Sequence, residues 1–373
     1  MLSFRIVRWT ELDSAVRAAW GLLVDRLGAN PTQHPDWLET VLASHGAIEG
    51  ACVLIAEQGG EVVGLVPFRR RWGRTFRLPV RQIEPLTNLV SYHARILGEG
   101  CEAALLEHLL ARKAAGSWHI FSMGSVVEGG ATHRALAEFA RRSGSVLLET
   151  AAEQSPFMPV TQDWPTFYRT KNTKFRNNLQ RSARLVNSAG EVTVRWYTAA
   201  SDAEALLEAI LAVEGESWKS AAEVDIGGRQ HETAYYRALL PLLGRRGSLL
   251  ANVLFLEGRP IAYCLLCVWN GWAGFLKNTY VDQYKSLGAG AHLIHLVLER
   301  AFAAGAREID FLGDALSYKL AWTPEVRSHV HVTLHSRAPL ARLIGHLQQR
   351  RLAARAPAGT PAPSAAAAQE GRE

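Results

Sequence analysis

The sequence predicts an α/β protein of two modules, in which mixed sheets are flanked by helices, and three observations support this fold class. Strand-like and helix-like segments alternate along the whole chain. Glycine-containing turns, Gly59-Gly60 and Gly258-Arg259, separate pairs of strands in both halves. A proline-rich stretch at 155–165, SPFMPVTQDWP, interrupts the pattern between the halves. The 373 residues, 48% hydrophobic and 20% charged, are enough for two cores.

The first half combines period-two apolar runs with amphipathic segments of helical period. We expect, in order, a strand at 2–9, helices at 11–27 and 35–44, hairpin strands at 51–58 and 61–70, a helix at 102–115, a strand at 118–123, a helix at 132–143 and a strand at 145–150. We interpret residues 1–155 as the N-terminal module.

The second half repeats a similar order of hairpin, helix and strand, which is consistent with a duplicated fold. We expect a basic helix at 167–190, a strand at 191–198, helices at 202–215 and 231–243, strands at 248–257, 260–270 and 271–281, a helix at 291–304, a strand at 307–313, a short helix at 315–321 and a strand at 326–336. Residues 156–345 form the predicted C-terminal module. The Ala/Pro-rich residues 354–373 predict a disordered tail.

The composition bounds location and partners. No apolar run reaches the roughly 20 residues of a membrane-spanning helix, and the start MLSFRIVRWTELD lacks the apolar core of a signal peptide. We therefore expect a cytoplasmic protein. The formal net charge of +6 is compatible with an anionic partner, such as a phosphorylated cofactor, a lipid head group or an acyl-carrier protein. No DNA partner is expected.

Two patterns with metal-ligand residue types do not lead to a predicted metal site. Cys264 and Cys267 have no second pair and lie in an apolar strand, which favours buried thiols. The histidines 329, 331 and 335 alternate along a strand, a spacing that suits a metal, but no carboxylate or cysteine accompanies them.

A strand that passes through a glycine-rich loop directly into a helix is the most informative local feature. The loop is Lys285-Ser286-Leu287-Gly288-Ala289-Gly290. A helix that starts there offers unpaired N–H groups to a phosphate, and glycine lets the backbone approach an oxygen closely. A plain turn into a helix remains the local alternative.

Three motifs in a fixed order give this loop more weight. They are KFRNNLQR at 174–181, YVDQYKSLG at 280–288 and DFLGDALSYKLAW at 310–322. Together they resemble the GNAT acyltransferases, specifically the CelD-type branch that is similar to the FemAB peptidyl transferases. The N-terminal module resembles the degenerate first GNAT-like half of that branch. The resemblance implies two tandem GNAT-like modules.

The resemblance also implies the co-substrate and its site. Acyl-CoA, as acetyl-CoA or a longer ester, lies across a splayed strand with its pyrophosphate on the loop, and no metal is required. Leu287 stands where the family has proline, which keeps an N–H but leaves the loop less stiff. The implied cofactor-binding residues are Thr279, Tyr280, Val281, Lys285, Ser286, Leu287, Gly288, Ala289 and Gly290.

Direct attack of an amine on a thioester needs a base for the amine and an acid for the leaving sulfur. The resemblance gives Tyr318 the role of acid, and Lys319 beside it is a candidate for holding an anionic group of either substrate. A tyrosine that only packs, with its hydroxyl in water, is the alternative for Tyr318. A surface lysine is the alternative for Lys319.

Candidate bases lie at three places. Glu214 and Glu216 are at the end of a helix that borders the acceptor pocket in GNAT folds, although helix carboxylates are commonly just solvated. Asp314 follows a strand, where α/β folds place working residues, but it also suits the N-cap of the next helix. His231 is a further candidate because of its near-neutral reference pKa.

The function of a basic helix and of three tryptophans can each be interpreted in two ways. The helix carries cations at 169, 171, 174, 176, 181 and 184 without an acid between them, and it is either a solvated face or a contact for phosphates of a membrane, a lipid-linked substrate or an acyl carrier. Trp218, Trp269 and Trp272 either line an acyl tunnel or belong to the core.

The leading prediction is an N-acyltransferase that moves an acyl group from CoA to an amine of a sugar or a sphingoid-like lipid, in lipid or polysaccharide biosynthesis of the cell envelope. Two alternatives remain open. One is a FemAB-like transferase that takes an aminoacyl group from charged tRNA. The other is a non-catalytic GNAT-like accessory protein of envelope polysaccharide synthesis.

Overall fold

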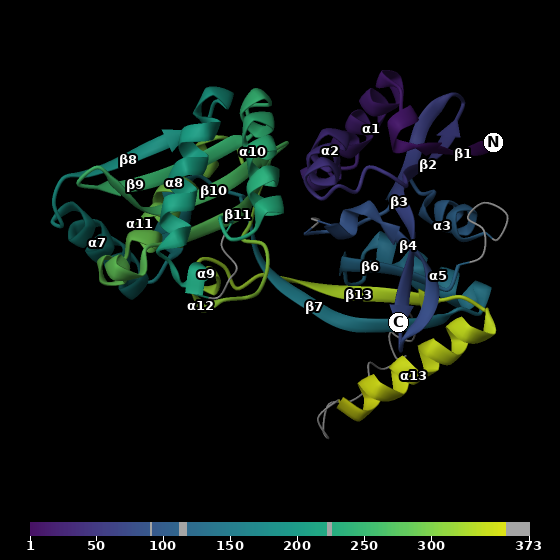
Figure 1. Cartoon of the computed structure of the whole chain (residues 1–373). Coiled ribbons are helices and arrows are strands. Elements are labelled where there is room, and N and C mark those ends of the chain that lie inside the picture. The colour runs from purple at the N-terminus through teal and green to yellow at the C-terminus, as the bar shows by residue number, and fades with distance from the viewer. Residues whose placement is uncertain (90–91, 112–117, 222–225, 356–373) are drawn as a thin grey trace, which may run out of the picture.

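The structure, a computed structural model, describes residues 1–89, 92–111, 118–221 and 226–355 (Figure 1). Its strands form one mixed sheet in the order β1-β2-β3-β4-β6-β13-β7-β12-β11-β10-β9-β8, and β5 pairs with β3. Helices pack on this sheet in both halves of the chain. The predicted α/β fold class is therefore confirmed.

The predicted elements of the first half occur in the predicted order, and most of their boundaries agree within two residues, but the strands at 78–85 and 97–98 were not predicted. Its strands are β1 (Leu2–Arg8), β2 (Ala51–Gln58), β3 (Glu61–Thr75), β4 (Leu78–Pro85), β5 (Leu97–Gly98), β6 (Ile120–Val127) and β7 (Val146–Pro159). Its helices are α1 (Ser14–Arg26), α2 (Pro35–Ser44), α3 (Glu102–Leu110) and α5 (Ala131–Ser143). The predicted helix at 102–115 extends at its end outside the described residues.

The second half also keeps the predicted order. Its strands are β8 (Val192–Tyr197), β9 (Leu249–Leu256), β10 (Arg259–Trp269), β11 (Trp272–Tyr280), β12 (Glu308–Asp310) and β13 (Val326–His335). Its helices are α6 (Trp164–Thr170), α7 (Thr173–Asn187), α8 (Ala203–Gly215), α9 (Trp218–Ala221), α10 (Gln230–Arg245), α11 (Ala289–Ala303), α12 (Ser317–Leu320) and α13 (Pro339–Arg355). Helix α13 includes residues 354 and 355 of the predicted tail, and 356–373 lie outside the described residues.

The sheet is continuous across the predicted boundary at 155/156. Strand β7 pairs with β13 through residues 146–156 and with β12 through residues 157–159. Strand β13 lies between β6 and β7, so a strand from the end of the chain completes the sheet of the first half (Figure 1). The prolines at 156 and 159 therefore do not interrupt regular structure. Pro156 lies where β7 changes its partner from β13 to β12, and Pro159 lies where β7 ends.

The predicted basic helix is two helices. Helix α6 ends at Thr170 and α7 begins at Thr173, where the Asn172 side chain accepts a hydrogen bond from the backbone N–H of Phe175 at 2.8 Å. An N-cap of this kind starts a new helix because it satisfies an otherwise unpaired donor. Lys171 lies in the break, and its ammonium donates to the carbonyl of Trp322.

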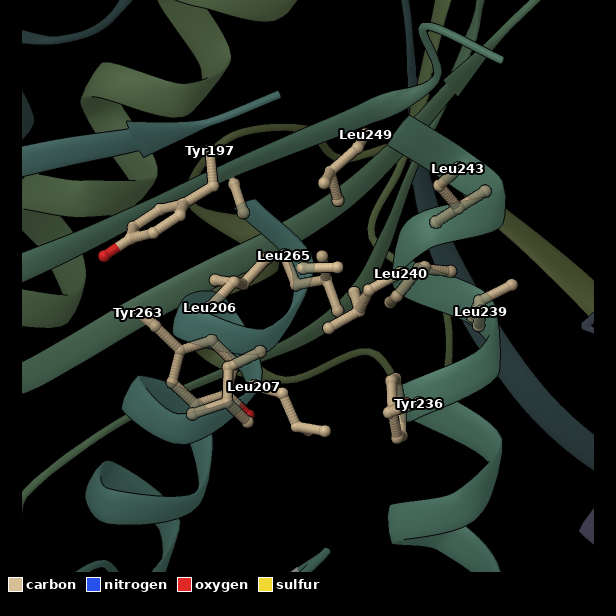
Figure 2. Packing of buried hydrophobic residues seen from close by; sticks show 14 of the residues in the cluster. Tyr197, Leu206, Leu207, Tyr236, Leu239, Leu240, Leu243, Leu249, Tyr263 and Leu265 are labelled. Atoms are coloured by element: carbon tan, nitrogen blue, oxygen red, sulfur yellow. The ribbon is translucent and has the colours of Figure 1, made fainter. Parts of the chain in front are cut away.

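Two apolar cores sandwich strands β9 to β11. On one face α8 and α10 contribute Leu206, Leu207, Leu239, Leu240 and Leu243, which belong to one apolar cluster with Tyr263 of β10 (Figure 2). On the other face α11 packs its own apolar stripe against the sheet. Within the described residues, no helix is long and apolar enough to span a bilayer.

Candidate active site

Strands β11 and β12 diverge after a short pairing. They are parallel partners only through residues 272–274 of β11 and 308–310 of β12. Strand β11 continues to Tyr280 whereas β12 ends at Asp310. The edge of β11 beyond Gly274 therefore has no strand partner on this side among the described residues, and its backbone donors and acceptors are available to a ligand.

A β-bulge adjoins this opening. Phe275 pairs with Leu266 and Lys277 pairs with Leu265, so Leu276 is the extra residue. A bulge lets consecutive side chains point to one face of the sheet. Accordingly Leu276 packs in the core of α8 and α10, and Lys277 contacts Glu214 and Glu232 of the same helices. Asn278 instead approaches Tyr318 of α12 on the opposite face.

A cavity of about 720 Å³, which we name the α11 cavity, lies on the α11 face of β11. Apolar side chains make up much of its wall, including Phe175, Leu179, Trp218, Ile294, Leu316 and Trp322. Its polar residues lie on α7, on β11, on the loop into α11 and on α12. Of the three tryptophans considered from the sequence, Trp218 lines this cavity, whereas Trp269 and Trp272 do not.

The glycine-rich segment forms the start of α11. The helix begins at Ala289, two residues before the predicted start, and no side chain caps its first turn. Gly288 has φ +68°, and a Cβ there would lie 2.5 Å from Ser182 Oγ of α7. Only glycine combines this conformation with this close approach. The uncapped N–H groups of the first turn and the helix dipole together favour an anion.

Six of the nine predicted cofactor residues line the α11 cavity: Thr279, Tyr280, Lys285, Gly288, Ala289 and Gly290. The other three do not. Val281 is buried in the core on the α8 face, Ser286 is exposed, and Leu287 packs against the α11 core. The hydroxyl of Thr279 is buried, with the residue only 4% exposed, and has no hydrogen-bond partner in the described part of the chain. A ligand group can satisfy it.

Tyr318 lies on the wall of the same cavity. Its hydroxyl faces Asn278 Oδ1 at 3.5 Å, long for a hydrogen bond, while 39% of the side chain is exposed. Burial of the hydroxyl raises the pKa of Tyr318 to about 12, and Asn278 opposes this only in part. The phenol is therefore protonated at neutral pH and available as a hydrogen-bond donor.

Lys319 is not in the cavity. Its buried ammonium donates to the carbonyl of Leu312, and burial lowers the pKa of Lys319. Leu312 and Gly313 both have positive φ, +50° and +61°. A left-handed leucine is strained, so an outside contact must hold it. Lys319 therefore supports the turn after β12 that carries Asp314.

Glu214 is fully buried and belongs to a hydrogen-bond network. Its carboxylate accepts from Lys219 Nζ at 2.7 Å, from Tyr263 Oη at 2.5 Å and from the backbone N–H of Ile226 at 2.7 Å. Burial by itself raises the pKa of Glu214, but Lys219 and Lys277 outweigh it and the pKa is lowered overall. Glu214 does not line the α11 cavity. It lies behind Lys277, with its carboxylate 3.5 Å from the Lys277 ammonium.

A second cavity, of about 600 Å³, lies on the other face of β11. We name it the α10 cavity because Glu232, Tyr235 and Tyr236 of that helix line it. Asp314 also lines it, together with His231. Asp314 does not cap α12, since Leu316 occupies the N-cap position. Glu216 is instead paired with Arg259 on the surface.

Several residues of this region escaped the sequence interpretation. Lys277 and Asn278 lie inside a strand-like run, and the bulge at Leu276, which no local pattern announces, decides which face of the sheet each of them takes. Ser182 is on a basic helix far from the loop in sequence, yet it touches Gly288. A polar pair at the end of an apolar strand was the one available signal.

A buried ionic network joins the two halves beside the opening. Asp310 Oδ2 is 2.7 Å from His93 Nε2 and 2.8 Å from Arg327 Nη1, and Ser155 donates to Oδ1 at 2.8 Å. Burial raises the pKa of Asp310, but these contacts lower it overall. His93 also lies 2.7 Å from His329. The network fixes the end of β12 relative to β7.

The other histidines and cysteines considered as metal ligands do not form a cluster. A register shift at residue 331 breaks the alternation of β13, so His331 is exposed while His329 and His335 are buried. Cys264 and Cys267 are buried free thiols, and burial raises the pKa of each. Within the described residues no group of three or more metal-type side chains gathers.

Comparison with known proteins agrees with this geometry. Residues 173–320, which include the loop, the opening and Tyr318, match the family model of the acetyltransferase (GNAT) domain. No curated protein matches the chain in sequence. Residues 173–320, less than half of the chain, are therefore similar to a GNAT acetyltransferase domain.

Solved structures share the fold over most of the chain. FemX superposes with a TM-score of 0.59 at 12% identity, covering 88% of this chain and 98% of FemX. The C-terminal domain of a candidate lysylphosphatidylglycerol synthetase from Agrobacterium fabrum gives 0.53 at 12% identity, covering 90% and 96%. A conserved protein of unknown function from Bacteroides thetaiotaomicron gives 0.54 at 14% identity, covering 90% and 100%. At such identities the likeness concerns the fold.

Proposed function

We propose that this protein is an N-acyltransferase, in which acyl-CoA occupies the α11 cavity and an amine reaches the thioester from the α10 cavity. One observation carries the proposal: β11 and β12 diverge between two cavities that lie on opposite faces of β11. Two substrates can enter from opposite sides and meet at the opening. Direct transfer needs this arrangement because it has no enzyme-bound intermediate to carry the acyl group between sites.

The α11 cavity suits a CoA ester. The first turn of α11 offers uncapped N–H groups to a pyrophosphate, and Lys285 adds a positive charge. The unpaired edge of β11 offers backbone groups to the amides of the pantetheine arm. The unpartnered hydroxyl of Thr279 is one more group that a bound ester satisfies. Bound acyl-CoA supplies the activated thioester.

The protein contributes proton transfer and positioning. The amine nitrogen forms a bond to the thioester carbon while the carbon–sulfur bond breaks, and the amine loses one proton. We assign Asp314, which lines the amine side, as the group that accepts this proton. Tyr318 donates a hydrogen bond to the departing sulfur. Full proton transfer from a phenol of pKa about 12 to a thiolate is uphill, since a thiol has a pKa near 8.5.

The CelD-type motifs support a finer assignment. On their basis we assign the protein to that branch, with an acceptor amine on a molecule of envelope lipid or polysaccharide synthesis. The family match at 173–320 contains two of the three motifs in full and most of the third.

Calorimetry and a turnover assay test the proposal. The full chain is titrated with acetyl-CoA, octanoyl-CoA and palmitoyl-CoA, and free thiol release is then followed with a panel of amines. We expect binding of at least one ester and amine-dependent thiol release. Absence of binding by every CoA ester would overturn the proposal.

A second candidate function is aminoacyl transfer from charged tRNA. It is supported by the exposed face of α7, where Lys174, Arg181 and Arg184 have no ion pair among the described residues. The same face suits an anionic membrane or an acyl carrier. Filter binding of tRNA at increasing salt separates these cases: a log-log slope near zero excludes a phosphate-tracking tRNA site.

A further inference from the structure

The α10 cavity differs in charge from the α11 cavity across the strand. Three carboxylates line it, and they come from three separate elements: Glu153 of β7, Glu232 of α10 and Asp314 of the turn after β12. In contrast, the polar residues that the structure describes in the wall of the α11 cavity include Lys285 and no carboxylate. One side of β11 therefore suits an anionic donor and the other side suits a cation.

Only part of this negative charge is compensated. Lys277, the lysine in the wall, lies 3.4 Å from Glu232 and 3.5 Å from the buried Glu214. Arg229 also pairs with Glu232, at 3.0 Å. Glu153 and Asp314 have no ion pair in the part of the chain that the structure describes. Two carboxylates thus remain for a ligand, and His45 and His231 are the other titratable groups of the wall besides the tyrosines.

The remaining wall is aromatic and polar. Tyr92, Tyr235 and Tyr236 line the cavity, and Lys277 already lies 5.6 Å from the centre of the Tyr236 ring. Aromatic faces attract cations. Ser125, also in the wall, has φ +49°, and strained backbone of this kind concentrates at functional sites. Among the described residues of the wall, the aliphatic ones are Leu239 and Leu276, too few to line a channel for a long alkyl chain.

We infer that the α10 cavity takes a compact hydrophilic amine that carries a second cationic group, such as a diamine or a diamino sugar, and not a long-chain lipid amine. The inference rests on the proposed function, because it names the acceptor of that reaction. The reacting nitrogen must be uncharged to attack, so it loses its attraction to carboxylates at that moment. A second ammonium, held by Glu153, keeps the molecule bound while Asp314 receives the proton.

Binding of defined probes to the full chain, without any CoA, tests this inference. The probes are 1,4-diaminobutane and 2-deoxystreptamine, with 1,4-butanediol and monomeric sphinganine as comparisons. We expect the two hydrophilic diamines to bind and the diol not to bind. Glu153→Gln and Asp314→Asn should each weaken diamine binding by at least about tenfold, since each removes one charge from the site.

Glu208→Gln is the matched control, because Glu208 is an exposed carboxylate of α8 outside both cavities. It should bind diamines as the unaltered chain does. Thermal melting establishes that each variant is folded. Two results would overturn the inference. One is tight sphinganine binding whose affinity is the same in Glu153→Gln as in the unaltered chain. The other is diamine affinity that is unchanged in both Glu153→Gln and Asp314→Asn.

The two hypotheses fail separately. If CoA esters bind but no hydrophilic diamine does, the acceptor class is wrong and the acyltransferase proposal stands. If the diamines bind through Glu153 but no CoA ester binds, the cation site stands and the proposed reaction fails. Binding of CoA to Glu153→Gln at unaltered affinity is expected, since Glu153 does not line the α11 cavity.

Discussion

At the scale of single residues, Tyr318 offers the most direct test of chemistry. Its raised pKa keeps the phenol protonated on the wall of the α11 cavity. Tyr318→Phe should lower kcat by about 10²-fold, because one preorganised donor to developing negative charge is lost. The affinity for CoA esters should change less than about twofold, because the ring stays in place.

Thiol release and calorimetry on the same preparation check this expectation. With a pKa near 12, Tyr318 does not titrate between about pH 6 and 9. The ratio of kcat of the unaltered protein to kcat of Tyr318→Phe should therefore be constant over that range. Tyr197→Phe removes a hydroxyl from the α8 core, outside the cavity, and should keep full kcat. A Tyr318→Phe enzyme of normal kcat would remove this residue from the mechanism.

Glu214 has a structural effect with a defined pH dependence. Its pKa is lowered in the folded state by Lys219 and Lys277. A carboxyl of lowered pKa adds stability above its unfolded pKa of about 4.3, and this stability is lost as pH falls through the folded pKa. Glu214→Gln should therefore reduce the free energy of unfolding by about 3 kcal/mol at pH 7, because it leaves Lys219 buried with a weaker partner.

Urea denaturation at pH 7 and at about pH 3.5 measures this effect. The difference in free energy of unfolding between the unaltered protein and Glu214→Gln should be smaller at the lower pH. Asp310, whose pKa is also lowered, is present in both proteins and cancels in the comparison. An equal difference at both pH values would show that charge on Glu214 is not the cause.

At the scale of elements, the passage into α11 depends on Gly288. Gly288→Ala should cost about 1–2 kcal/mol for a side chain at positive φ, and the new Cβ must also displace Ser182. Because α7 and the first turn of α11 meet at this contact, we expect CoA affinity to fall by about tenfold, or about 1.4 kcal/mol.

Gly305→Ala is the control for conformation alone. Gly305 has φ +78°, and a Cβ there meets nothing within 4 Å. It should lose similar stability but keep its CoA affinity. Ser182→Gly combined with Gly288→Ala should restore part of the affinity. If Gly288→Ala and Gly305→Ala affect CoA equally, the contact with α7 is not important for binding.

At the scale of the whole molecule, the position of β13 links the two halves. A fragment of residues 160–325 lacks both β7 and β13, so β12 loses its partner β7. We expect this fragment to show no cooperative thermal unfolding by circular dichroism, because the edge beside the site is left open. The full chain measured in parallel is the reference. Cooperative unfolding of the fragment with full CoA affinity would contradict this expectation.

The sequence by itself determined the α/β class, the order of most elements and the glycine-rich passage from a strand into a helix. These depend on local signals: period-two runs, helical apolar stripes, and glycine at positions such as Gly59 and Gly288. Six of the nine predicted cofactor residues line one cavity because they all lie within residues 279–290, a strand, loop and helix whose geometry is local.

The tertiary structure alone decided how these elements share partners. Strand β13 pairs with β6, about 200 residues earlier in the chain, and β7 divides its length between two partners. The bulge at Leu276 put Lys277 on the same face as Leu276, where it contacts Glu214, and left Asn278 on the opposite face. Such pairings depend on contacts between residues distant in sequence, so no local pattern can specify them.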